Sequence, residues 1–145
     1  MKRAFSLIEL LIYMALLGMF LVVLTNILVT ALESQAESTA TSLVDIDSRF
    51  ILNRLMYDVG HATSISTPAS VGQTSTSLGL SSGTYSLSGG NLLLGGIQVN
   101  SYDSQINNFS VTRIGNGIDN DTVSVSFTVS SGNLSRSYST TLGLR

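Results

Sequence analysis

The first part of the chain is apolar without a break. From Leu10 to Leu32 the sequence LLIYMALLGMFLVVLTNILVTAL has 23 residues and no charge. A helix of that length extends about 35 Å, enough to cross a hydrocarbon core of ~30 Å. An ordinary secretory signal has a shorter apolar region followed by a small-residue cleavage site, which is missing before Glu33. The pattern therefore predicts a helix that spans a membrane, and a plain signal anchor is the alternative.

A second helical pattern follows the apolar run. No Pro or Gly occurs between Phe20 and Val59, so the helix can continue beyond the membrane. Apolar residues then recur at steps of three and four, which predicts an amphipathic face made of Leu43, Ile46, Phe50, Ile51, Leu55, Val59 and Ala62. With Gly60 near its end, we expect one helix from Phe5 to about Ala62.

After Pro68 the pattern changes to that of β-strands. The runs TYSLS and NLLLG are joined by Gly89-Gly90, a two-residue hairpin signal, and a short run IQVN comes next. Three longer runs follow: INNFSVTRI, TVSVSFTVS and LSRSYSTTL. In the second of them Ser and Thr alternate with Val123, Val125, Phe127 and Val129. That alternation is typical of a half-buried antiparallel strand.

These patterns together predict an α+β fold. A long N-terminal helix would pack its second half on an antiparallel β-sheet of four to six strands. We expect residues 5–32 to be the transmembrane half of the helix, residues 33–66 its amphipathic exported half, and residues 67–145 the antiparallel β domain.

Composition and charge narrow the class of protein. Of the 145 residues 43% are hydrophobic and only 11% charged, against about a quarter charged in soluble domains. The chain has no Cys, which excludes disulfides and thiolate metal sites. Its net charge is −2, whereas a general nucleic-acid binder is strongly basic. No nucleic acid is therefore expected as a partner.

The few charges near the apolar run are informative. Lys2 and Arg3 precede it, which predicts a cytoplasmic N-terminus and an exported C-terminal domain. Glu9 lies inside the apolar region, where an acidic side chain at a helix centre costs roughly 2.5–3.5 kcal/mol. A functional role for Glu9 requires a positive partner, which the span does not contain.

The segment KRAFSLIELLIYMALLGMFLVV resembles the N-terminal signature of type IV pilins and of the pseudopilins of type II secretion. In that family a short basic leader is followed by Phe, a polar residue, two aliphatic residues, Glu and a long apolar helix. The resemblance implies that residues 1–4 are the leader and that prepilin peptidase cuts between Ala4 and Phe5 and methylates the Phe5 amine. Glu9 would then be the subunit-assembly residue. Ala4 departs from the family, which usually has Gly before the cut.

The resemblance also implies partners and a location. The partners would be other pilin or pseudopilin subunits, the prepilin peptidase, an inner-membrane assembly platform and a separate cytoplasmic ATPase. The protein would cross the inner membrane once and then enter a filament at the periplasm or cell surface. Beyond the N-terminus the pattern is similar to minor members of the family, including the larger pseudopilin of type II secretion.

Candidate sites of other kinds are weak. His61 is the only histidine and has no nucleophile motif around it, so no catalytic site is expected. Asp119 and Asp121 are weak candidates for calcium ligands, but Asp-Asn-Asp is also ordinary turn chemistry, and we expect no metal or cofactor. Arg49, Arg54 and Asp58 lie on the amphipathic helix, where a solvated face is favoured over bridges between subunits.

Three functions remain open from the sequence. The favoured one is a minor pilin or pseudopilin that builds, primes or caps a filament. The second is a filament-tip module whose uncharged β surface contacts a surface or a secreted substrate. The third is a single-pass anchored protein that never polymerises.

Overall fold

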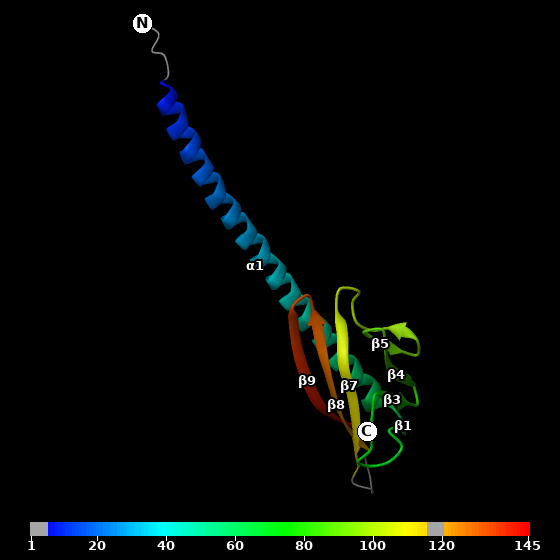
Figure 1. Ribbon diagram of the computed structural model, residues 1–145. Coiled ribbons are helices and arrows are strands. Elements are labelled where there is room, and N and C mark those ends of the chain that lie inside the picture. The colour runs from blue at the N-terminus through cyan, green and yellow to red at the C-terminus, as the bar shows by residue number, and fades with distance from the viewer. Residues whose placement is uncertain (1–5, 116–120) are drawn as a thin grey trace. The chain divides into compact units, whose positions relative to one another are not determined.

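The protein's computed structural model describes residues 6–115 and 121–145, in which it contains one helix and nine strands. The chain forms two compact units, Met1–Thr39 and Ala40–Arg145. The helix α1, Leu7–His61, begins in the first unit and ends in the second (Figure 1). The predicted long helix is confirmed, and it ends one residue before Ala62.

One sheet of the second unit has five antiparallel strands in the order β1-β3-β4-β5-β6. The bounds are Ile65–Thr67 for β1, Ser77–Leu80 for β3, Gly83–Ser88 for β4, Asn91–Leu94 for β5 and Ile97–Gln98 for β6. Ser88 pairs with Asn91 across the predicted two-residue turn, in which Gly89 and Gly90 have φ of 59° and 80°. Positive φ at both positions suits a type I′ hairpin, which explains the Gly-Gly pair.

The other sheet has four antiparallel strands in the order β2-β7-β8-β9. Their bounds are Thr74–Ser75 for β2, Gln105–Ile114 for β7, Thr122–Ser131 for β8 and Leu134–Gly143 for β9. The α+β prediction of a helix on antiparallel strands is confirmed, with the strands divided between two sheets. The short strands β1, β2 and β3 were not foreseen, because two to four residues are too few to show a period of two.

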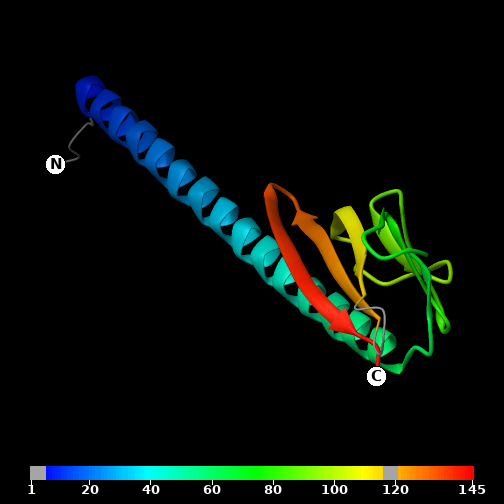
Figure 2. The ribbon, with the colours of Figure 1, turned by 90° about the horizontal axis from the view of Figure 1, so that it is seen from below.

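The core of the second unit lies between α1 and the sheets. Helix residues Val44, Ile51, Leu55 and Val59 are fully buried in it. Figure 2 shows the C-terminal part of α1 running beside the strands β7–β9. The alternation predicted for β8 is confirmed, since its buried apolar members are Val123, Val125, Phe127 and Val129.

The predicted amphipathic face was wrong in two positions. Ile46 and Phe50 are 64% and 52% exposed, whereas Asp47, Ser48 and Asp58 are buried. The sheet therefore contacts a face of α1 that is rotated away from Ile46 and Phe50. Burial of carboxylates is tolerable there because each one has bonding partners in the β domain or on α1.

The two buried carboxylates join α1 to the β domain. Asp47 accepts hydrogen bonds from the backbone N–H of Ser101 at 3.0 Å, from its hydroxyl at 2.7 Å, and from the Ser104 hydroxyl. Asp58 accepts the Tyr85 hydroxyl and pairs with Arg54 Nε at 2.9 Å. Burial and the bond to Asp58 raise the pKa of the Tyr85 phenol. The Asp47 contacts connect α1 to a loop, and the Asp58–Tyr85 contact connects α1 to β4. Both fix the packing of α1 against the β domain.

Candidate functional site

The site predicted from the sequence lies at the start of α1. The Ser6 carbonyl accepts the backbone N–H of Glu9 at 3.0 Å and of Leu10 at 3.2 Å. Because α1 begins at Leu7, Ser6 occupies the N-cap and Glu9 the third helical position. Ser-x-x-Glu at these positions is the sequence of a capping box. This Ser-x-x-Glu spacing was not noted in the sequence, and it marks the start of α1.

The N-terminal end of α1 stabilises the charge of Glu9 but does not pair it with a cation. Its negative charge lies in the first turn of α1, where the helix dipole stabilises an anion. Its side chain is exposed, and no ion pair of Glu9 is found among residues 6–115 and 121–145. The helix end therefore supports the carboxylate without neutralising it, and a cation from outside the described chain has access to it.

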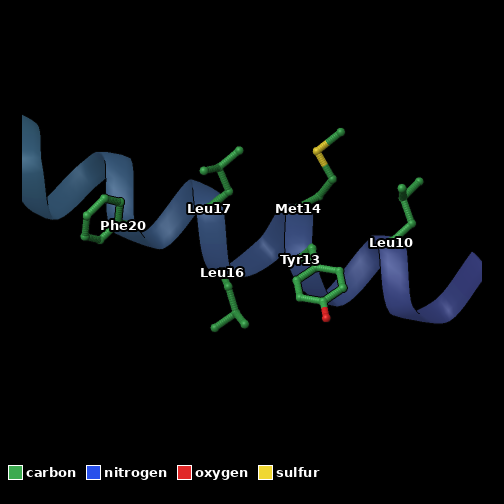
Figure 3. Close-up of a pocket in the computed structure, with 6 residues that line it drawn as sticks. All are labelled: Leu10, Tyr13, Met14, Leu16, Leu17 and Phe20. Carbon is green, nitrogen blue, oxygen red and sulfur yellow. The ribbon is translucent and has the colours of Figure 1, made fainter. Parts of the chain in front are cut away.

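The surface around this end of α1 is apolar on all sides. Six of its apolar and aromatic side chains are drawn in Figure 3, where they project from the helix in different directions: Leu10, Tyr13, Met14, Leu16, Leu17 and Phe20. From Leu7 to Leu32 every large apolar side chain is exposed, Leu7 by 76%. The chain by itself thus leaves this apolar area uncovered.

The same segment fits a membrane. Within the described residues α1 is the helix that is long and apolar enough to span a bilayer, with a mean hydropathy of 2.6 in its most apolar stretch. None of that stretch is buried by the protein itself. Lipid or other helices are the environments in which such a surface is stable.

The other predicted site residues are dispersed. Ala4 and Phe5, the expected cleavage and methylation positions, and Asp119 lie outside the described residues. Asp121 forms an ion pair with Arg113, whose Nε lies 3.1 Å from the second carboxylate oxygen. In the part of the chain that the structure describes, no cluster of three or more His, Asp or Glu side chains is placed to hold a metal.

The charged residues of the amphipathic helix differ from expectation. A solvated face was predicted for Arg49, Arg54 and Asp58, and this is wrong for Asp58, which is buried against Tyr85. Arg49 is exposed, as predicted. His61 is exposed and stacks on Tyr57 with ring centroids 4.2 Å apart, and its Nδ1 lies 2.8 Å from the Tyr57 carbonyl oxygen. The side chain of His61, the last residue of α1, thus packs against the last turn of the helix.

Comparison with known proteins also points to the N-terminal segment. Residues 1–25 match the family model of the prokaryotic N-terminal methylation motif. No curated protein and no solved structure matches the chain. The family evidence therefore comes from the segment that contains Glu9 and the first part of the apolar helix.

Proposed function

The chain carries the N-terminal signature of type IV pilins and pseudopilins, and from this premise we propose that it is a minor pilin or pseudopilin that assembles into a filament through α1. The signature points to a structural subunit and not to an enzyme. The observation that carries the proposal is the uncovered apolar surface of Leu7–Leu32 with one carboxylate, Glu9, at its end.

Processing would create the partner that Glu9 requires. Cleavage after Ala4 by a prepilin peptidase removes Lys2 and Arg3 and produces an α-amine on Phe5, which is then methylated. With the basic pair on the cytoplasmic side, the cut occurs at the inner face of the membrane. The mature chain keeps five Arg against nine acidic residues.

Assembly would follow from charge and packing together. At ~4 Å and an effective dielectric near 20, the Phe5 amine of one subunit attracts Glu9 of its neighbour by about 4 kcal/mol before desolvation. Because an unpaired buried charge costs several kcal/mol, the pair disfavours helix registers that leave Glu9 alone. The apolar side chains from Leu10 to Leu32 then pack helix against helix. A separate ATPase and an inner-membrane platform would drive this assembly.

Replacement of Glu9 tests the proposal. We expect Glu9→Ala to insert in the membrane and to be processed, yet to fall at least tenfold in sheared filaments. Glu33→Ala is the matched control, because Glu33 is an exposed acid on the same helix outside the apolar run. The control should enter filaments normally.

The outcomes separate the alternatives. Mass spectrometry of assembled protein should find a methylated Phe5 at the N-terminus. Equal incorporation of the two variants would show that Glu9 is dispensable for assembly. An intact Met1 in assembled protein would overturn the proposal altogether.

A further inference from the structure

A small hollow lies in the second unit, between α1 and one edge of the five-stranded sheet. Its volume is about 310 Å³, and two residues of α1, three of β5 and β6 and one that follows β6 line it: Phe50, Arg54, Leu94, Ile97, Gln98 and Val99. The strand β6 is the last in the order β1-β3-β4-β5-β6, so no further strand of this sheet covers the hollow. The hollow is open to solvent, since Phe50 and Ile97 are 52% and 76% exposed.

The walls of the hollow are mostly apolar. Phe50 and Ile97 form its exposed part, and Leu94 and Val99 are half-buried beside them. Ligand pockets in proteins range from roughly 300 to 1,000 Å³, and this hollow is at the lower end of that range. Its size therefore suits a compact group with an apolar part, and not a large cofactor or a long acyl chain.

The hollow contains one cation, which the protein itself holds in place. Arg54 Nε donates to Asp58 at 2.9 Å, and Asp58 also accepts the Tyr85 hydroxyl. No hydrogen bond of the two Arg54 Nη groups is found among residues 6–115 and 121–145. The Arg54 side chain is 48% exposed and that of Asp58 only 8%, so an incoming group meets the guanidinium and not the carboxylate. A fixed, accessible guanidinium is a strong donor to a carboxylate.

The hollow also contains a fixed acceptor. Gln98 Nε2 donates to the carbonyl oxygens of Asn100 at 3.0 Å and of Ser101 at 3.3 Å. These two bonds fix the amide group, and its Oε1 accepts no hydrogen bond in the part of the chain that the structure describes. Since an amide oxygen accepts hydrogen bonds, Gln98 Oε1 is free to receive an N–H from a ligand.

We propose that this hollow binds the carboxylate end of another polypeptide chain whose last side chain is apolar. The last residue of such a chain carries a carboxylate for Arg54, a backbone N–H for Gln98 and an apolar side chain for the walls, all on one Cα. Capture of a C-terminal carboxylate is a known mode of peptide recognition. A fatty acid lacks the N–H. An internal acidic residue carries its carboxylate and its apolar neighbour on different Cα atoms.

Two peptides that differ in one group test the proposal. The probe is fluorescein-labelled Gly-Ser-Gly-Val-Leu with a free carboxylate, and its control is the same peptide with a C-terminal amide. Fluorescence anisotropy with the full-length protein in phospholipid nanodiscs measures both affinities. The free carboxylate should bind at least tenfold more tightly, because only it forms a charge-assisted bond with Arg54.

Variants of the hollow have matched controls on the same domain. Arg54→Gln keeps an amide that can donate to Asp58 but removes the positive charge, and it should weaken binding at least tenfold. Arg49→Gln makes the same change at an exposed Arg of α1 outside the hollow and should bind normally. If Arg54→Gln misfolds, Ile97→Glu replaces it, because Ile97 is exposed. It should abolish binding, whereas Val71→Glu, at an exposed position that does not line the hollow, should not.

Four results would overturn the proposal. They are no binding of the free-carboxylate peptide up to about 1 mM, equal binding of the two peptides, equal binding by the Ile97→Glu and Val71→Glu variants, and displacement of the peptide by hexanoate at the peptide's own concentration. Peptide binding that weakens as the protein concentration rises would also overturn it and assign the hollow to a second copy. Glu9→Ala should bind the peptide normally, so failure of filament assembly and failure of peptide binding are distinguishable.

Discussion

Residues 7–32 and residues 44–61 belong to one helix but meet different surroundings. In the first segment the apolar side chains are all exposed, and the single charge is Glu9. In the second, the buried set includes two carboxylates and a serine, while Ile46 and Phe50 are exposed. Hydrophobicity alone therefore does not tell which residues of α1 are covered by the protein.

The difference shows where each segment finds its partners. The second segment is completed by its own chain, which supplies Ser101, Ser104 and Tyr85 to its carboxylates. The first segment has no such complement in the described residues of its own unit, so lipid or neighbouring subunits must provide it. The stability of residues 44–61 should therefore depend on folding of the β domain, and that of residues 7–32 on the lipid or helices around them.

The largest expected effect comes from the same substitution made in both segments. Leu55→Ala removes a fully buried side chain from the core and should lower the free energy of unfolding of the β domain by about 2–5 kcal/mol. Leu17→Ala changes an exposed side chain in the apolar half and should change it by less than about 0.5 kcal/mol. Urea unfolding in micelles, followed by circular dichroism of the sheet, measures both. Equal losses of unfolding free energy in the two variants would contradict the difference between the two segments of α1.

A smaller effect is expected at the buried contact of Asp58 with Tyr85. Tyr85→Phe removes one hydrogen-bond partner of Asp58. It should lower the free energy of unfolding by about 1–3 kcal/mol. Tyr102→Phe is the control, because Tyr102 is 94% exposed.

The same contact should make stability depend on pH. Burial and the Asp58 bond raise the pKa of Tyr85 in the folded state, whereas the unfolded phenol ionises near pH ~10. The stabilisation is therefore complete below about pH 10 and is lost as the pH rises above it. Urea unfolding from pH 9 to 12 should show this loss in the unaltered protein and not in Tyr85→Phe. A parallel fall in the two proteins would exclude Tyr85 as its source.

The smallest effect should come from the surface pair between Arg136 and Asp45. Both side chains are 40% exposed or more, so Arg136→Ala should cost only about 0.2–1 kcal/mol. The loss should shrink in 1 M salt, because salt screens exposed charges. Urea unfolding at low and high salt gives the difference. A cost above that of Tyr85→Phe would mean that the edge strand β9 depends on this ion pair for its position.

The sequence by itself determined the features that depend on local patterns. The uninterrupted apolar run predicted the N-terminal helix, Gly89-Gly90 predicted the turn between β4 and β5, and strict alternation predicted the buried side of β8. The methylation motif could be identified from the contiguous residues 2–23. Each of these features depends on residues that are close together in the chain.

The tertiary structure decided the features that depend on residues far apart. Ile46 and Phe50 fit a helical stripe as well as Val44 and Ile51 do, and only the position of the sheet selects between them. Burial of Asp47 and Asp58 depends on hydroxyl groups 54, 57 and 27 residues away. Strand pairing left β9 with a free edge, since the order of strands is set by packing and not by the pattern within each strand.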